Sequence, residues 1–275
     1  MASGGISPDG KVVFGAFNFS ESAILANIYA QAATAAGVPA EVVSVGPREL
    51  VYPQLFKGEL GVVPEYSGTA VVALGGDATS DSAKTHDALV DLMKPKDVAV
   101  LDSAPAEDRN AIAVTLDTAT RLNVQTMTDL ARVAADLTLG GPAECPQRPL
   151  CIPGFESTYG IKFKTFVPLD SGVPTASSLA RGEVGAALVF TTDASISPFT
   201  LITLDDDKGM FPADNVTPVV RQEVLDKYPQ LGAALDKVSA ALTTRDVRAL
   251  NYTVALAGER PDQAARTWLQ DQGLI

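Results

Sequence analysis

Side chains that could carry out catalysis are scarce in this sequence of 275 residues. Its one histidine, His86, lies in a polar stretch, Lys84-Thr85-His86-Asp87, which predicts a solvated surface position. Asp205, Asp206 and Asp207 resemble a metal cluster, but three adjacent residues do not all face one point, so a solvated turn is the simpler interpretation. The chain also lacks the Gly-x-Ser-x-Gly, Walker and Gly-x-Gly-x-x-Gly motifs. We therefore predict no catalytic residue, no metal and no cofactor. Together with the two hinged lobes predicted below, the absence of these motifs favours binding over catalysis.

The two cysteines, Cys145 and Cys151, enclose a short proline-rich loop. A disulfide between them would fix this loop, and disulfides persist in oxidising compartments. The alternative is a pair of reduced thiols. Zinc is disfavoured, because the lone, distant His86 does not complete a four-ligand site. We predict the Cys145–Cys151 disulfide.

Length and composition indicate a globular protein that exceeds the usual size of a single core, so two domains are expected. Hydrophobic residues make up 46% and charged residues 20%, with a formal net charge of −12. This acidic balance disfavours nucleic acid and anionic membrane surfaces as partners. No apolar run reaches the roughly 18–20 residues that span a bilayer. Residues 1–5 do not resemble a secretory signal, which either was removed or never existed.

Alternating strand and helix patterns organise the first part of the chain. A strand that is apolar on both faces is expected at 11–17, followed by helical spacing over 23–30. Further strands are expected at 40–45 and 60–64, with a helix that opens at 46–49 and runs to 56 between them. This order predicts right-handed crossovers in an open α/β sheet.

A second alternation predicts a second lobe, and a mainly helical region follows it. Its expected strands are 111–115, 136–139, 164–169, 185–190 and 201–204, with helices at 127–134 and 175–181. C-terminal helices are expected at 231–242, 246–251 and 261–270. We assign 11–108 to lobe 1, 109–204 to lobe 2, and 205–275 to the return into lobe 1. Because no flexible linker separates the lobes, crossover strands acting as a hinge are expected.

Short motifs in a fixed order resemble the substrate-binding proteins of ABC importers for glycine betaine, choline, proline and related osmoprotectants. Each motif is weak alone, but together they span nearly the whole chain from about residue 11. They are Phe19-Ser20-Glu21-Ser22 with Ile24-Leu25, Gly46-Pro47-Arg48-Glu49, Pro64-Glu65-Tyr66-Ser67-Gly68-Thr69, Leu169-Asp170-Ser171-Gly172, Arg181-Gly182-Glu183-Val184, Phe190-Thr191-Thr192-Asp193, Asp206-Asp207-Lys208-Gly209, Pro218-Val219-Val220-Arg221, Leu250-Asn251-Tyr252 and Gly273-Leu274-Ile275.

The resemblance implies a two-lobed, type II periplasmic-binding-protein fold, each lobe a mainly parallel sheet flanked by helices. It also implies an extracytoplasmic protein, either free or lipid-anchored, that captures a small solute in the cleft between the lobes. The expected partners are a membrane permease and its cytoplasmic ATPase, and the binding protein is expected to be a monomer. Two rivals are a sensory module without transport and an enzyme on the same bilobal architecture.

The resemblance further implies an aromatic cage, because a methylated cation cannot donate hydrogen bonds and is attracted to aromatic faces instead. Tyr66 and Phe190 stand at cage positions, although Tyr66 could also be a core residue at a strand end. Asn110 and Ala176 stand where two more aromatic residues are expected. Asn110 offers a donor and an acceptor. The cage therefore leaves two ligand classes open, namely quaternary amines and larger hydroxyl-bearing compounds such as sugar-like or polyphenolic ones.

Polar ligand contacts are predicted at one helix N-terminus and in two loops that follow strands. In lobe 1, Ser20, Glu21 and Ser22 lie at a helix N-terminus, where they either contact ligand or cap the helix. The other predicted contacts are Ser67 and Thr69 in lobe 1 and Thr191, Thr192 and Asp193 in the corresponding loop of lobe 2. We expect Arg48, Phe155, Tyr159 and Trp268 to be structural.

Overall fold

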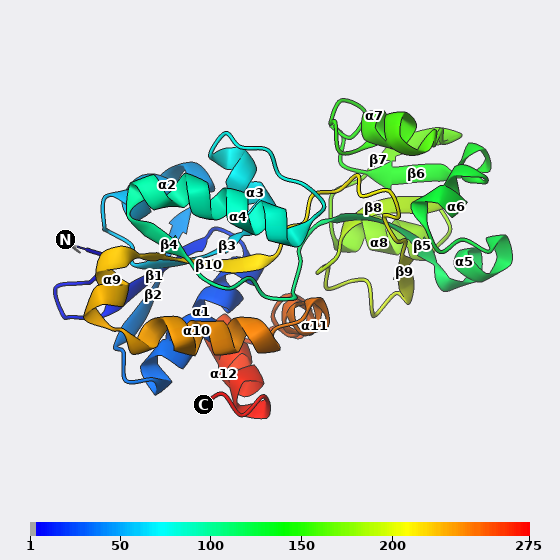
Figure 1. Cartoon of the computed structure of the whole chain (residues 1–275). Helices are drawn as coiled ribbons and strands as arrows, with labels where there is room; N and C mark the ends of the chain where they lie inside the picture. Colours follow the sequence, from blue (N-terminus) through cyan, green and yellow to red (C-terminus); the bar gives the residue numbers. More distant parts are fainter. Residues whose placement is uncertain (1–3) are drawn as a thin grey trace. The chain divides into compact units, whose positions relative to one another are not determined.

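The computed structural model describes residues 4–275, which divide into two compact units (Figure 1). Unit 1 comprises the N-terminal residues up to Glu107 together with Ala213–Ile275, and unit 2 is the continuous segment Asp108–Pro212. Unit 2 begins at Asp108, one residue before the expected start of lobe 2 at 109. It ends at Pro212, eight residues beyond the expected end at 204, so 205–212 belong to unit 2. A physical reason is that Asp206 accepts hydrogen bonds from the Tyr159 hydroxyl and the Met210 and Phe211 amides of this unit.

Unit 1 contains a five-stranded mixed sheet with helices on both faces. Its elements before the first division are β1 (Val12–Phe17), α1 (Ser20–Ala35), β2 (Ala40–Gly46), α2 (Arg48–Phe56), β3 (Val62–Tyr66), α3 (Ser67–Ala73), α4 (Ser82–Met93), the 3₁₀ helix η1 (Lys94–Lys96) and β4 (Val98–Val100). The later elements are β10 (Val216–Arg221), α9 (Gln222–Lys227), α10 (Gln230–Ala241), α11 (Thr244–Ala255) and α12 (Pro261–Asp271). The strand order is β2-β1-β3-β10-β4.

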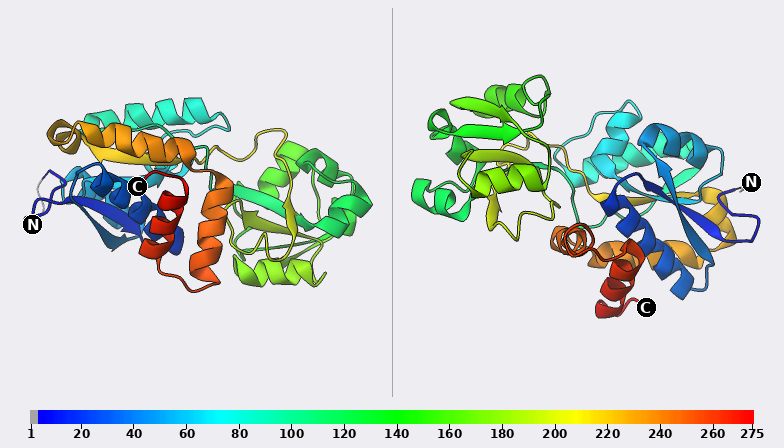
Figure 2. Two further views of the ribbon diagram at one scale, coloured as in Figure 1. Left: turned by 90° about the horizontal axis from the view of Figure 1, so that it is seen from below. Right: turned by 180° about the vertical axis from the view of Figure 1, so that it is seen from behind.

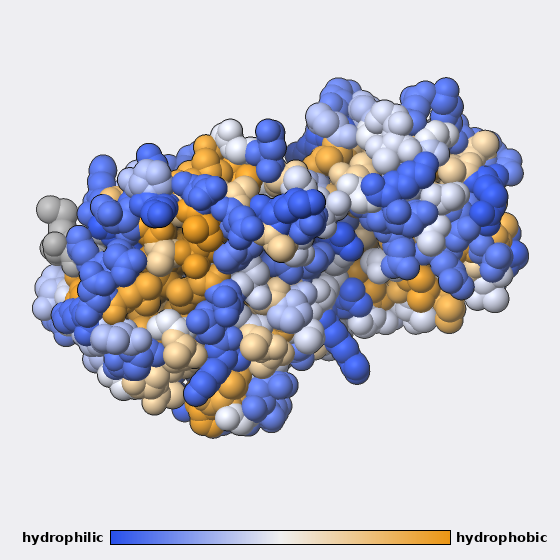
Figure 3. All heavy atoms as spheres, viewed as in Figure 1, coloured by the Kyte–Doolittle hydropathy of each residue, from blue (hydrophilic) through white to orange (hydrophobic). Residues whose placement is uncertain are grey.

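The two faces of this sheet follow from alternating side chains, as a strand requires. Val12 and Phe14 pack with α1 and the C-terminal helices, whereas Val13 packs with α2, α3 and α4 on the other face. Figure 2 shows α1 and α12 together on one face, and the space-filling view shows an apolar patch near α2, β4 and α9 on an otherwise largely polar surface (Figure 3). The expected placement of Trp268 in the core is confirmed.

Unit 2 repeats this plan with its own five-stranded sheet, ordered β7-β6-β8-β5-β9. Its α6 and η3 cover one face and α8 the other. Phe155 and Tyr159 are buried in the first of these cores, as expected. The elements are β5 (Asn110–Thr115), α5 (Leu116–Leu122), α6 (Met127–Ala131), η2 (Ala134–Asp136), β6 (Thr138–Gly141), α7 (Ile152–Gly154), the π-helical η3 (Phe155–Tyr159), β7 (Thr165–Pro168), α8 (Val173–Ala180), β8 (Ala186–Phe190) and β9 (Leu201–Thr203).

One strand of each sheet runs against the others. β10 is antiparallel to β3 and β4, and β5 is antiparallel to β8 and β9. Each of these strands is the first that the chain forms after it passes from one unit to the other. The α/β prediction is confirmed, and the expected parallel order holds for the strands other than β5 and β10, so both sheets are mixed.

The segments at which the chain leaves and re-enters unit 1 are paired with each other. Glu107 and Asn215 form an antiparallel bridge, and the amide of Val216 donates to the carbonyl of Ala106 (2.9 Å). The side chain of Asn215 adds a bond to the carbonyl of Ala104 (2.9 Å). The two connections therefore form a short hydrogen-bonded ladder rather than two independent loops.

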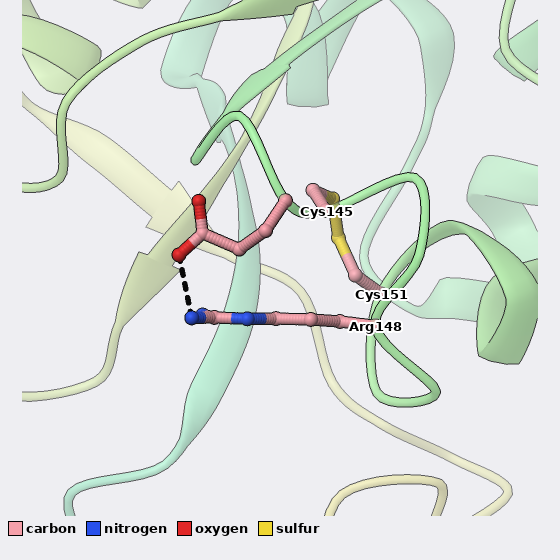
Figure 4. Close-up of a disulfide and its surroundings, with 4 residues drawn as sticks. Cys145, Arg148 and Cys151 are labelled. Atoms are coloured by element: carbon pink, nitrogen blue, oxygen red, sulfur yellow. Dashed lines mark hydrogen bonds and ion pairs between the residues drawn. A yellow bond between two sulfur atoms is a disulfide. The ribbon is translucent and has the colours of Figure 1, made fainter.

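The predicted disulfide between Cys145 and Cys151 is present in unit 2, with both cysteines fully buried (Figure 4). Beside it, Arg148 forms an exposed ion pair with Glu144 (2.5 Å). The covalent link closes a loop with a sequence separation of 6 residues and lies in the core with Phe155. It therefore joins the loop after β6 to the start of α7.

Replacing both cysteines with serine is expected to lower the free energy of unfolding by about 2 kcal/mol, because the cross-link restricts a short loop in the unfolded chain. Urea unfolding followed by circular dichroism measures this. Glu144→Gln, which removes only the exposed ion pair, is the control and is expected to cost less than about 1 kcal/mol. Equal midpoints for the double-serine variant and the wild type would contradict a stabilising role.

Candidate ligand-binding site

Aromatic side chains gather where β1 and β3 end in unit 1. Phe17 and Phe19 stack with ring centroids 5.8 Å apart, and Phe19 lies 6.2 Å from the ring of Tyr66. Parallel strands bring their carboxyl ends to one edge of the sheet, where α1 and α3 begin. Tyr66 is only 4% exposed, whereas Phe19 is 45% exposed. The exposed face of this group is therefore supplied mainly by Phe19, which the sequence did not single out as a ligand contact.

Glu21 in the first turn of α1 holds Tyr66. The Tyr66 hydroxyl donates to Oε1 of Glu21 at 2.6 Å, and Asn251 Nδ2 from α11 donates to Oε2. Glu21 is only 8% exposed. The helix begins at Ser20 with Phe19 at the N-cap position and no side-chain cap bond there, so Ser20 is not the N-cap that was one of its two expected roles.

A buried ion pair supports the backbone just before Tyr66. Arg48 donates two hydrogen bonds to the fully buried Glu65 (3.0 and 2.8 Å), which also accepts the amide of Tyr66 (3.0 Å). Burial opposes the charged form of Arg48, but the hydrogen bonds and charge of Glu65 prevail and raise the pKa of this guanidinium. The same group lies 4.6 Å from the centroid of Phe17. Arg48 thus braces both Phe17 and the end of β3.

Several predicted hydroxyl contacts have structural partners in unit 1. Ser22 is fully buried and accepts the amide of Phe17 (2.8 Å), and the fully buried Ser67 accepts the amide of Asn215 (3.1 Å). Ser20 and Thr69 are exposed. These positions favour a structural role for Ser22 and Ser67 and leave Ser20 and Thr69 accessible.

Asp214 is a further carboxylate at this edge that sequence reasoning missed. Asp214 lies two residues after Pro212, the last residue of unit 2. Its carboxylate accepts hydrogen bonds from the amide (2.8 Å) and the hydroxyl (2.5 Å) of Thr69. Burial raises the pKa of Asp214 to about 6, against the opposing effect of the Thr69 bonds, and the charges of Glu65 and Arg48 add smaller, opposite effects.

The stability of the fold is expected to depend on this carboxyl group between about pH 4 and pH 6. Because its folded pKa lies above the ordinary 3.8, the folded state holds the proton more tightly than the unfolded state. The stabilisation that this carboxyl group provides is complete below its pKa in the unfolded state. It is lost as pH rises through its pKa in the folded state. Compared with Asp214→Asn, the wild type should gain free energy of unfolding from pH 7.5 to pH 4, as measured by urea unfolding. A pH-independent difference would contradict the raised pKa.

In unit 2 the predicted residues cluster where β8 ends. Phe190 lies opposite Asn110 in the β5–β8 register and is 42% exposed. The Thr191 hydroxyl accepts the amide of Arg109 (3.1 Å), and the Thr192 hydroxyl donates to Asp108 (2.7 Å). These bonds fasten the loop to the segment that enters unit 2.

Two other residues of this unit have core or local roles. Asp193 accepts the amide and hydroxyl of Ser195 (2.9 and 2.5 Å). Ala176, which stands at an expected aromatic position, is fully buried in the core beside α8. It therefore presents no surface to a ligand.

The residues that could have suggested catalysis are mostly structural. His86 is half-buried, with Nε2 3.1 Å from the carbonyl oxygen of Leu101, so its predicted solvated position is wrong. Asp206 orders its turn through the three bonds described above, and Asp207 accepts the amide of Thr128 (3.1 Å), so this turn is more than a solvated loop. Across residues 4–275, no helix combines the length and apolar character that a membrane span needs.

The chain matches the OpuAC family, described as the substrate-binding domain of ABC-type glycine betaine transport systems, over residues 10–271. It is 29% identical to the glycine betaine-binding protein YehZ of Escherichia coli strain K12 over 268 residues, which cover 92% of this chain and 88% of that protein. It is 27% identical to the carnitine transport binding protein OpuCC of Listeria monocytogenes over 273 residues, which cover 97% and 88%.

Among solved structures, that of a glycine betaine/carnitine/choline ABC transporter matches with a TM-score of 0.90 at 27% identity and covers 95% of this chain and 98% of that one. This similarity confirms the predicted two-lobed type II binding-protein fold. Since the family match extends over nearly all of the sequence, the chain belongs to the substrate-binding proteins of ABC-type glycine betaine importers, a family of transport proteins and not of enzymes.

Proposed function

We propose that the protein captures a small quaternary ammonium compound and delivers it to the permease of an ABC importer driven by a cytoplasmic ATPase. The observation that carries this proposal is the Phe19–Tyr66 aromatic pair, whose tyrosine is bonded to the carboxylate of Glu21. Aromatic faces beside a negative charge suit a cation that cannot donate hydrogen bonds. The names of the relatives support the same class of ligand, since one binds glycine betaine and another carnitine.

Unit 2 supplies a second set of contacts in this proposal. Phe190 offers an exposed ring and Asn110 a donor and an acceptor at the paired strand position. Closure of the two units on a ligand held by both would be stabilised by the added contacts. We further propose that the protein works at the extracytoplasmic side of the membrane, because importers of this kind receive their solute there. We also propose that it works as a monomer.

A second candidate ligand class is favoured by two observations. Asn110 lies at an expected aromatic position, and Asp214 with Thr69 adds polar atoms in unit 1. Such groups suit a larger hydroxyl-bearing compound, because its hydroxyls donate to and accept from amide and carboxylate side chains. Transport of a sugar-like or polyphenolic compound is therefore the alternative.

A titration panel separates the two classes. Choline, glycine betaine and carnitine are compared with sugars, polyols and polyphenols by thermal shift and by isothermal titration. A ligand at 100 times its Kd is expected to stabilise the folded protein by about 2.7 kcal/mol. Binding of quaternary amines alone supports the main proposal, and binding of hydroxyl-bearing compounds alone overturns it in favour of the alternative. Loss of uptake of the bound compound in cells that lack this protein would distinguish transport from a purely sensory role.

A further inference from the structure

The carboxylate of Glu21 is shared between two elements that are far apart in the sequence. Its Oε1 accepts the Tyr66 hydroxyl at the end of β3, and its Oε2 accepts the amide of Asn251 in the middle of α11. Glu21 itself belongs to the first turn of α1 and is buried. Both of its oxygens are thus engaged within unit 1, and the side chain does not need to touch a ligand to influence it.

The bond to Tyr66 has two physical consequences. It fixes the rotation of the phenol, because a hydrogen bond to a carboxylate is short and strongly directional. It also raises the electron density of the ring, since a phenol that donates to an anion is polarised toward a phenolate. A more electron-rich ring attracts a cation at its face more strongly. The buried negative charge adds a direct attraction that surrounding water screens only partly.

We propose that Glu21 is a positioning residue that makes Tyr66 selective for a cation, and that Asn251 positions Glu21. The inference rests on the proposed function and deepens it, because it changes the predicted role of Glu21 from ligand contact to support of Tyr66. It also gives a role to the Leu250-Asn251-Tyr252 motif. In this arrangement α11 orders the site through the side-chain amide of Asn251.

The charge of Glu21 is tested with Glu21→Gln, choline and 3,3-dimethyl-1-butanol, a neutral compound in which carbon replaces the quaternary nitrogen. The glutamine keeps the size of the side chain and both hydrogen bonds, because the Asn251 amide can turn to present its oxygen. Isothermal titration is expected to give a choline Kd about tenfold higher than in the wild type, with a change of less than about twofold for the neutral compound.

Asn251→Ala tests positioning without a change of charge. It is expected to raise the Kd values of both compounds by a similar factor of about three, because the carboxylate loses one of its two restraints. The matched control is Glu49→Gln, which removes the first-turn glutamate of α2 from an exposed position and should leave both Kd values unchanged. Melting temperatures of all variants verify that the protein is folded at the temperature of titration.

The outcomes separate the inference from the function on which it rests. An equal loss for choline and the neutral compound in Glu21→Gln overturns the charge effect, and no loss in either variant overturns both roles. If the wild type binds none of choline, glycine betaine and carnitine, the proposed function is wrong and this inference falls with it.

Discussion

Replacing Tyr66 with alanine is expected to raise the Kd for a quaternary ammonium ligand about thirtyfold. The loss follows from removal of a desolvated aromatic face, which is worth about 2 kcal/mol to a cation. Tyr66 also packs beside Phe19, so the exposed Phe19 ring would keep only Phe17 of the two aromatic neighbours described above. Isothermal titration with glycine betaine and choline measures the effect.

The control for this substitution is Tyr252→Ala. Tyr252 is 45% exposed on α11, next to Asn251 in the sequence, and its removal is expected to leave the Kd unchanged. Because Tyr66 is nearly buried, its alanine variant will also lose stability, so titrations are run well below its melting temperature. A folded Tyr66→Ala protein that binds as tightly as the wild type would remove Tyr66 from the site.

Arg48→Met is expected to have the largest effect on stability, a loss of about 3–5 kcal/mol in the free energy of unfolding. The substitution leaves Glu65 as a fully buried carboxylate without its cation, and an uncompensated buried charge costs about this much. The methionine retains most of the apolar contact that the arginine stem makes beside Phe17. Urea unfolding at pH 7 gives the value.

Two further variants show whether the buried charge is the cause. Arg148→Met breaks an ion pair whose side chains are both more than half exposed, and it is expected to cost less than about 1 kcal/mol. Adding Glu65→Gln to Arg48→Met should restore part of the lost stability, because the neutral amide is cheaper to bury than an unpaired carboxylate. If Arg48→Met and Arg148→Met cost the same, burial of Glu65 does not determine the penalty.

Local pattern was sufficient to predict most elements of both units. The apolar runs that became β1 and β5 and the helical spacing that became α1 and α12 are visible without tertiary information. β10 was not predicted as a strand, because Pro218 is unusual in the interior of a sheet. It is accommodated in a pair where it lies opposite Pro64 of β3. Such a pairing depends on residues more than 150 positions away and has no local signal.

The candidate site also contains residues with a local sequence signal and residues whose roles depend on distant partners. Tyr66 and Glu21 could be singled out because each lies at the junction of a strand and a helix, where open α/β sheets bind ligands. Asp214 and Asn251 were missed because their roles depend on Thr69 and Glu21, which are distant in the sequence. Phe19 was within a motif already singled out, and an apolar residue just before a helix start was the available signal.

The position of β10 between β3 and β4 imposes an order on how the protein is made. Among the strands of residues 4–275, β4 pairs with β10 alone, so its edge has no partner until residues 216–221 emerge from the ribosome. Unit 2, a single uninterrupted segment, is complete before then and can condense first. The N-terminal part of unit 1 must wait, with apolar strands uncovered, for the last quarter of the chain. This long-range closure makes unit 1 the slower and more aggregation-prone part to assemble.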